Sequence, residues 1–237
     1  MSKPQFVEDN IYHVYNRGVE KRNVFLRDRD YLRFIHDLYE FNDVDPVSNV
    51  WYYFNPKYNE VEPHYIPKER KKRKLLVEIL AFVLMPNHYH LLLRQLRENG
   101  IVNFMQKLGG YTMYFNKVNQ RVGPLFQGRF KAVAVTEEPH FIYLPFYIHV
   151  NPIKIYRGST SLDKTMKFLE SYRWSSFPDY IGKKNFPSIT SRRFLHECFG
   201  GEKEQRNEMR QLVKTKFADL EKVSELTLDD DFGMLQK

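Results

Sequence analysis

The spacing of apolar residues predicts a chain in which short strands and helices alternate. Residues 11–16 alternate in the manner of a strand, and an acidic helix start at 28–30 precedes apolar positions at helical spacing up to Phe41. Two further strands are predicted at 75–84 and 88–93. The first half of the chain therefore predicts one helix among three strands.

The second half of the chain completes a recognisable order of elements. A helix is predicted over about 102–118, a strand over 130–135, and a helix over 137–150 that stops before Asn151 and Pro152. The order strand, helix, strand, strand, helix, strand, helix is that of a ferredoxin-like or RRM-like split unit. We therefore predict an α+β fold, in which helices cover one face of an antiparallel sheet and the other face is open.

Two segments lie outside this predicted unit. Residues 43–74 are rich in prolines and aromatic residues and include the basic run 68–74, so we interpret them as a basic insertion in a hairpin. Residues 181–237 have helical spacing and mixed charge. We therefore predict two domains, a main domain over residues 1–180 and a helical C-terminal appendage over residues 181–237.

The charge of the chain is unevenly distributed. The 237 residues carry a formal net charge of +8, and a hydrophobic content of 42% is enough for a globular core. Residues 181–237 hold 11 Lys and Arg against 10 Asp and Glu, so the positive excess lies in residues 1–180. A basic balance of this size favours a polyanionic partner.

Cysteine usage and hydropathy restrict the expected cellular compartment of the protein and its possible metal ligands. The single cysteine, Cys198, permits no internal disulfide and no cysteine-based zinc cluster, which is typical of a reducing cytoplasm. The sequence has no apolar run of membrane-spanning length and does not open with a signal peptide. We expect a soluble, cytoplasmic protein in which any metal is held by His, Asn or carboxylate side chains.

Two histidines lie one residue apart in an apolar strand. Because side chains alternate along a strand, His88 and His90 point to the same face, and Tyr89 points to the other. Two imidazoles on one face of a buried strand need partners, and a bound metal ion would satisfy both. Hydrogen bonds to nearby backbone groups are the alternative explanation.

A second polar pair lies on the helix predicted over 137–150. Tyr147 and Asn151 are four residues apart, so they share one face, where a carboxamide oxygen can join two imidazoles around a metal beside a phenol. The alternatives are simple packing of the tyrosine ring and a left-handed helix end at Asn151. Pro145 should kink the helix or confine it to its first turn.

Four sequence blocks resemble one protein family in content and in order. They are Tyr12 to Gly18 (YHVYNRG), Met85 to His90 (MPNHYH), Gly123 to Lys131 (GPLFQGRFK) and Tyr147 to Lys154 (YIHVNPIK). The chain resembles the HUH single-tyrosine transposases, specifically the REP-associated tyrosine transposase branch, over roughly residues 8–180.

The resemblance implies a metal-dependent enzyme that nicks and rejoins single-stranded or hairpin DNA. His88 and His90 match the metal-binding pair, and Tyr147 matches the nucleophile. Asn151 matches the third metal ligand, where related transposases often carry Gln. The implied cofactor is Mg²⁺ or Mn²⁺, whereas ligand softness alone would suit zinc or manganese. The implied intermediate is a 5′-phosphotyrosine link with a free 3′-hydroxyl.

The sequence leaves several alternatives open. The same scaffold would serve a nucleic-acid-binding regulator that has lost the chemistry, or a metal-dependent hydrolase that uses water instead of Tyr147. The appendage would contact a DNA hairpin, cap the active site or pair two subunits as a homodimer, and the sequence does not choose among these roles.

Basic and polar residues near the predicted strand ends are candidates for DNA contact, mainly with phosphates. They are Arg17, Lys21, Arg22, Arg121, Gln127, Arg129, Lys131 and Lys154. Solvated surface charge is the alternative for any one of them. Tyr111 and Tyr114 are rival nucleophiles by residue type, but their apolar periodic context favours packing or base stacking.

Overall fold

A four-stranded antiparallel sheet lies at the centre of the molecule. The computed structural model describes residues 4–45, 52–55, 60–63, 72–158 and 161–222. The strands of the sheet are β1 (Ile11–Arg17), β4 (Val77–Met85), β5 (His88–Gln95) and β6 (Lys131–Ala134), in the spatial order β4-β5-β1-β6. This order, with antiparallel pairing throughout, confirms the predicted α+β fold with a ferredoxin-like split unit.

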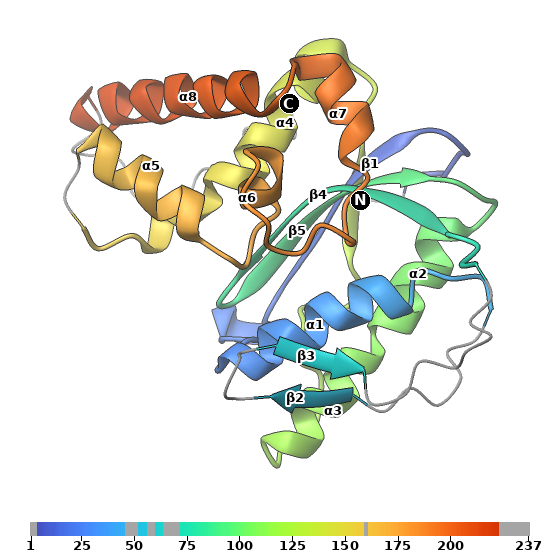
Figure 1. Cartoon of the computed structure of the whole chain (residues 1–237). Helices are drawn as coiled ribbons and strands as arrows, with labels where there is room; N and C mark the ends of the chain where they lie inside the picture. The colour runs from blue at the N-terminus through green and yellow to red at the C-terminus, as the bar shows by residue number, and fades with distance from the viewer. Residues whose placement is uncertain (1–3, 46–51, 56–59, 64–71, 159–160, 223–237) are drawn as a thin grey trace.

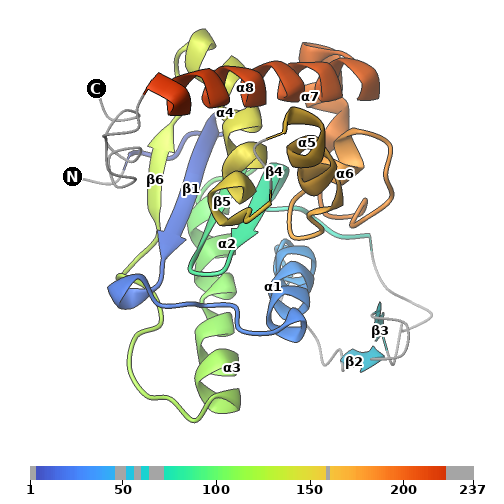
Figure 2. The same cartoon turned by 90° about the vertical axis from the view of Figure 1, so that its left-hand side faces the viewer.

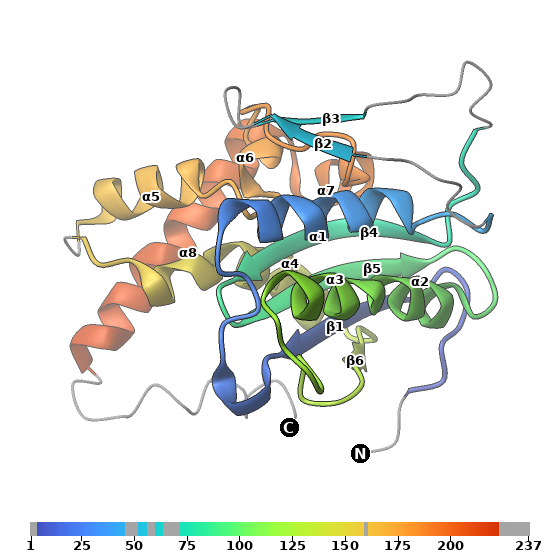
Figure 3. The same ribbon diagram turned by 90° about the horizontal axis from the view of Figure 1, so that it is seen from below.

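Three helices cover one face of the sheet, as Figure 3 shows. They are α1 (Asp28–Glu40), α2 (Gly100–Leu108) and α3 (Gly110–Val118). Asp30 fixes the start of α1, because its carboxylate accepts hydrogen bonds from the backbone N–H groups of Leu26 and Arg27 at 2.9 and 3.1 Å. Phe34 and Leu38 of the same helix are fully buried in the core.

The single helix predicted over 102–118 is wrong, because the chain forms two helices that meet at Gly109. The N–H of Gly109 donates to the carbonyls of Met105 and Gln106 at 3.1 and 3.2 Å, and this closes α2. Gly109 and Gly110 weaken a continuous helix here, since glycine is about 1 kcal/mol less favourable than alanine in a helix interior.

The other face of the sheet is covered too, at β4 and β5. Helix α4 (Glu138–Val150) packs against these strands, and the remaining helices lie beyond it (Figures 1 and 2). They are α5 (Leu162–Ser171), α6 (Phe177–Tyr180), α7 (Arg192–Phe199) and α8 (Glu202–Lys222). The expectation of an open face is therefore wrong at these two strands. The reason is that every side chain from Leu144 to Val150 is buried, so this part of α4 needs partners on all sides.

A second apolar cluster joins α4 to the C-terminal helices. Its buried members are Phe146, Val150, Met166, Leu169, Phe177, Met209 and Val213. They come from α4, α5, α6 and α8, so the cluster includes residues on both sides of the domain boundary predicted at residue 180. The helices predicted after that boundary are present as α7 and α8.

The predicted insertion contains an antiparallel hairpin, formed by β2 (Tyr52–Asn55) and β3 (Glu60–Pro63). Most of the basic run 68–74 lies outside the described residues. Arg73 is described, and it donates to the carbonyl of Tyr39 at 2.6 Å while stacking on that ring at 3.5 Å. Within the described ranges, no helix combines the length and the apolar character needed to cross a membrane.

Candidate active site

The pairing of β1 with β5 decides which side chains share a face with the histidine pair. Tyr15 of β1 lies opposite His90. His88 and His90 share this face, which α4 covers, because side chains alternate along each strand. Tyr89 points to the other face, where its ring lies 5.1 Å from the ring of Phe34 on α1. The alternation predicted for the histidine strand is therefore present.

Helix α4 brings the second polar pair to the histidines. The ring of Tyr147 lies 6.1 Å from the ring of His90, and the rings of His88 and His90 lie 5.1 Å apart, measured between centroids. Asn151 begins the short 3-10 helix η2 (Asn151–Ile155), and its φ of −48° and ψ of −38° are right-handed helical. The left-handed alternative for Asn151 is therefore wrong, and the fold brings all four predicted residues together.

Pro145 lies in the interior of α4, two residues before Tyr147. The expectation that it would confine the helix to its first turn is wrong, because the helix continues to Val150. Proline has no N–H, so it offers the carbonyl of Phe141 no helical hydrogen bond. Burial of the surrounding apolar side chains holds the helix together across this gap.

The hydrogen bonds of Asn87 fix the position of the proton on His88. Nδ2 of Asn87 donates to the carbonyl of Lys21 at 3.1 Å, so Oδ1 is the atom that faces Nδ1 of His88, at 2.6 Å. A carboxamide oxygen can only accept, and the proton of neutral His88 is therefore on Nδ1. Nε2 of His88 then carries a lone pair that can bind a metal ion.

Two buried acceptor atoms of this site, Nε2 of His88 and Oδ1 of Asn151, have no donor in the described part of the chain. Nδ2 of Asn151 donates to the carbonyl of Tyr147 at 2.8 Å, which leaves Oδ1 as an acceptor. This Oδ1 and Nε2 of His88 are buried, and neither has a hydrogen-bond partner in the described part of the chain. The Asn151 side chain lies within reach of the His88 ring, but the neutral pair has no proton to share. Each unmatched buried acceptor is unfavourable by about 1–3 kcal/mol, so the pair favours a bound cation or donor.

Both histidines of the pair are neutral. Burial, together with the positive charges of Arg17 and Lys154, lowers the pKa of His88 to about 3. Burial also lowers the pKa of His90 well below its ordinary value, and the neighbouring histidines and Lys154 add to the effect. Neutral imidazole is the form that binds metal ions, so both rings are in the ligand-competent state at neutral pH.

The residues present fit a divalent cation. In the described part of the chain, no three His, Cys, Asp or Glu side chains are arranged to hold a metal ion, so a metal site here would need a ligand of another type. Asn151 offers one, because its Oδ1 is buried without a hydrogen-bond partner in that same part. Two neutral imidazoles and one amide oxygen combine donors that suit manganese and magnesium with donors that suit zinc.

A third histidine, His13 of β1, belongs to this site and is not among the predicted residues. Its Nε2 lies 2.8 Å from Nδ1 of His90, and the two rings are nearly parallel, at 18°, with centroids 5.0 Å apart. Burial, with a smaller contribution from His140, lowers the pKa of His13 to about 3, so this ring is neutral too. The one signal in the sequence is that His13 and Tyr15 alternate in a strand as His88 and His90 do. It becomes informative only once β1 is known to pair with β5.

Two of the predicted DNA-contacting residues lie beside the histidines. Arg17 is the last residue of β1 and pairs in register with His88, and Nζ of Lys154 lies 5.9 Å from the centroid of the Tyr147 ring. Both cations are close enough to lower the pKa of His88. They make this side of the sheet electropositive, which favours an anionic ligand.

Two other predicted contacts hold their own loops instead. Arg22 forms an ion pair with Glu20 at 2.9 Å, just after the 3-10 helix η1 (Val19–Lys21). Arg121 donates to Oδ1 of Asn116 at 2.6 Å and to the carbonyl of Pro124 at 3.3 Å. Arginines engaged in this way are less available for phosphate contact.

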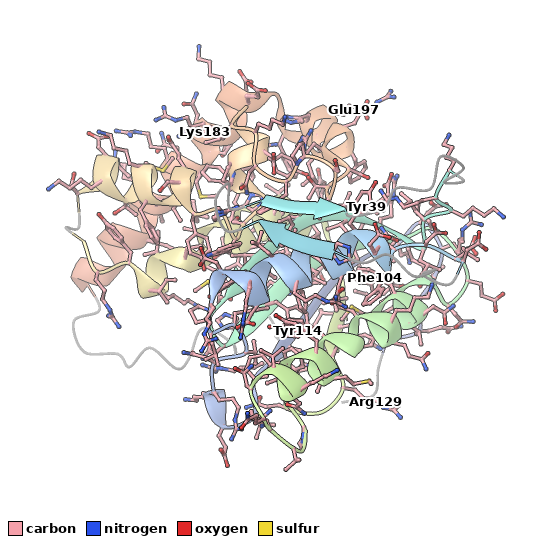
Figure 4. All side chains as sticks on the ribbon, turned by 60° about the horizontal axis from the view of Figure 1, so that its bottom comes forward. Tyr39, Phe104, Tyr114, Arg129, Lys183 and Glu197 are labelled. Carbon is pink, nitrogen blue, oxygen red and sulfur yellow. The ribbon has the colours of Figure 1, made fainter. Side chains whose placement is uncertain are left out.

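The remaining predicted contacts are exposed. Lys21, Gln127 and Lys131 lie near the ends of β1 and β6. Arg129, labelled in Figure 4, lines a hollow of about 670 Å³ on the α2–α3 side of the sheet, away from the histidine pair. Lys21 is connected to the histidine site through its backbone carbonyl, which accepts the hydrogen bond from Nδ2 of Asn87.

The rival tyrosines of α3 lie on the other face of the sheet. Tyr111 is fully buried, and its hydroxyl donates to the carbonyl of Val24 at 2.6 Å. Tyr114 lies between α3 and α1, with its hydroxyl 3.4 Å from Oδ1 of Asp30 (Figure 4). Both tyrosines pack in the interior or against α1, so neither shares the histidine site.

No protein-family model matches this chain, and no curated protein is similar to it. Among solved structures, a REP-associated tyrosine transposase bound to a REP hairpin is similar over 81% of this chain and 94% of that chain. The sequence identity is 13% and the TM-score is 0.49.

Proposed function

We propose that this chain is a metal-dependent DNA strand transferase that nicks and rejoins single-stranded DNA at a hairpin or palindrome. The observation that supports this most is the pair of buried acceptors, Nε2 of His88 and Oδ1 of Asn151, held close to Tyr147. Structural metal sites are closed by four protein ligands, whereas three donors leave coordination positions for a substrate. Arg17 and Lys154 favour an anionic substrate at those positions.

The proposed reaction is a transesterification. Oη of Tyr147 attacks phosphorus, the bond from phosphorus to the 3′-oxygen breaks, and the phenolic proton ends on the released 3′-hydroxyl. A different 3′-hydroxyl can then attack the 5′-phosphotyrosine and release the tyrosine, so rejoining needs no ATP. When bound, the divalent ion, Mg²⁺ or Mn²⁺, would polarise the scissile phosphate and neutralise its developing charge.

The side chains of the site divide this work among them. The ligands would be His88, His90 and Asn151. A phenol with an ordinary pKa of about 10 is protonated at neutral pH, so Tyr147 needs help to become a nucleophile. Lys154, close to the Tyr147 ring, would favour the phenolate, and Arg17 would hold a phosphate beside His88.

Access to Tyr147 requires a local movement. The residue exposes 4% of its surface, and the ring of Tyr143 lies 5.7 Å from its ring. Tyr143 and Lys154 are both exposed, so we expect an arriving DNA strand to displace these two side chains without unfolding α4.

Covalent capture tests this proposal directly. Purified protein is incubated with Mn²⁺ or Mg²⁺ and a library of 3′-fluorescent DNA hairpins with randomised single-stranded flanks. The expected result is a fluorescent protein band that survives SDS, because the 3′ fragment stays linked to Tyr147. The adducted peptide is then identified by mass spectrometry.

Matched tyrosine variants locate the nucleophile. Tyr147→Phe should abolish the adduct and keep metal binding, whereas Tyr143→Phe, one turn earlier on α4, should keep both. His88→Ala should weaken metal binding and the adduct together. Cleavage that persists in Tyr147→Phe would indicate a hydrolase that uses water. DNA binding without any adduct in the library would indicate a regulator, and either result would overturn the proposal.

A further inference from the structure

We propose that His13 is a positioning residue, which accepts a hydrogen bond from Nδ1 of His90 and so keeps Nε2 of His90 as the metal-binding atom. The role in metal binding rests on the proposed function. The tautomer of His90 does not, and it can be measured without metal or DNA.

The geometry places His13 where such a partner has to be. Its Nε2 lies 2.8 Å from Nδ1 of His90, and the two side chains expose 3% and 1% of their surface. His13 pairs in register with Leu92, and Tyr15 pairs with His90, so His13 is the diagonal neighbour of His90 on the same face. Neighbouring strands of one sheet hold this contact, and it does not depend on a mobile loop.

Only one proton can lie between the two nitrogens. The ring that carries this proton determines whether Nε2 of His90 can bind a metal. If His13 donated it, Nδ1 of His90 would be the acceptor and the proton of neutral His90 would be on Nε2. That proton would block the atom that has to bind a metal. If His90 donates the proton, His13 is the acceptor, and Nε2 of His90 carries a lone pair.

The neighbouring ligand supports the second arrangement. His88 already carries its proton on Nδ1, because the only partner of that atom in the described structure, Oδ1 of Asn87, is an acceptor. A proton on Nδ1 of His90 makes the two rings equivalent, with both Nε2 atoms available to one ion. Partners of this kind orient metal-bound histidines, and their loss typically weakens metal affinity about 10–100-fold.

The experiment combines two His13 variants with a distant control. His13→Gln can still accept through its amide oxygen, whereas His13→Leu has no acceptor. The control is His196→Gln on α7, whose ring lies 3.1 Å from the carbonyl of Gly200. Ring tautomers of the metal-free wild-type protein are read from two-bond ¹H–¹⁵N NMR correlations. Affinity for Mn²⁺ alone is measured by calorimetry, and thermal unfolding reports whether each variant is folded.

The expected results are specific. The wild-type spectrum should show His88 and His90 protonated on Nδ1. His13→Leu should raise the Mn²⁺ dissociation constant about 10–100-fold, His13→Gln should recover most of the loss, and His196→Gln should not change it.

The following results would refute the role of His13 or distinguish it from the proposed metal function. A proton on Nε2 of His90 in the wild-type protein, wild-type affinity in folded His13→Leu, or equal weakening in both His13 variants would each refute the role of His13. If His13→Leu fails to fold, the wild-type tautomer decides. If no protein binds Mn²⁺ while His90 is protonated on Nδ1, the proposed metal function fails and the hydrogen bond from His90 to His13 stands.

Discussion

His88 and Asn151 each direct their hydrogen-bond donor to a neighbouring group, and each keeps one buried acceptor without a donor in the described part of the chain. Nδ1 of His88 and Nδ1 of His90 contact the side chains of Asn87 and His13, and Asn151 uses its amide hydrogens on the carbonyl of Tyr147. The alternative of histidines tied to nearby backbone therefore does not describe these Nδ1 contacts.

Asn151→Asp should convert the lone acceptor into a buried negative charge. Without metal, the carboxylate has no matched donor, so we expect a loss of about 3 kcal/mol in the free energy of unfolding. With Mn²⁺, the charge is compensated, and the rise in melting temperature should exceed that of the wild-type protein. Differential scanning calorimetry measures both effects.

The matched control is Asn103→Asp, on the exposed surface of α2. It should change stability by less than about 0.5 kcal/mol with or without Mn²⁺. Equal behaviour of the two variants would show that Oδ1 of Asn151 does not face a cation site.

Arg17→Gln and Lys154→Gln should each weaken DNA binding and lower the slope of log K against log salt by about 1, because one phosphate contact is lost. Fluorescence anisotropy at several salt concentrations measures the slope. Arg121→Gln is the comparison, since its guanidinium is bound to Asn116 and Pro124. An equal change of slope in all three variants would contradict the assignment of Arg17 and Lys154 to the substrate side.

At the scale of elements, the sequence predicted what depends on local pattern. The alternation predicted for β5 is present, and Asn151 follows Tyr147 by four residues, although it lies in η2 and not in α4. Gly109 and Gly110 offered a local signal for the break between α2 and α3 that the prediction missed. The burial of α4 on all sides could also have been inferred, because its second half is apolar around the whole helix.

Helix α5 is tied to α8 through a buried carboxylate. Glu170 accepts hydrogen bonds from Lys183 at 2.8 Å and Arg206 at 2.6 Å. Burial opposes ionisation of Glu170, but these two cations outweigh it and lower its pKa below the ordinary 4.5. The ionised carboxylate therefore stabilises the folded state above the ordinary pKa. This contribution is lost as the pH falls through the lowered pKa of the folded state.

Glu170→Gln should accordingly lower the free energy of unfolding by about 1 kcal/mol at pH 7, a modest value because both cations are half exposed. The difference from the wild-type protein should shrink as the pH is lowered toward 3. Urea unfolding at both pH values measures it. Glu197→Gln, in an exposed pair with Arg193, should have little effect, and a pH-independent loss in Glu170→Gln would argue against the ion pairs.

At the scale of the whole molecule, sequence patterns could not show which distant strands and helices meet. His13 joins the site only through the pairing of β1 with β5, and the position of α4 on the sheet depends on α8 behind it. The division of the chain at residue 180 stays a prediction. The cluster around Phe146, Val150 and Met209 gives a way to test it.

Met209→Ala should destabilise the entire protein by about 3 kcal/mol, because Met209 is fully buried and its loss leaves a cavity. If α8 and the sheet form one cooperative unit, a single thermal transition should move to lower temperature. Met113→Ala is the control, since Met113 is 77% exposed and should have almost no effect. Two separate transitions, only one of which shifts, would instead support independent domains.

The proposed ligands His88, His90 and Asn151 are all electrically neutral, and this has a consequence for the order of assembly. A divalent ion held by such ligands keeps its full charge while Arg17 and Lys154 repel it, so we expect the ion to bind measurably to the empty protein but more weakly than to its complex with DNA. A DNA phosphate brings the missing negative charge. Thermodynamic linkage then requires that DNA strengthens ion binding by the same factor as the ion strengthens DNA binding. Cleavage would thus require the ion and the DNA strand to be bound together, and neither alone would be sufficient.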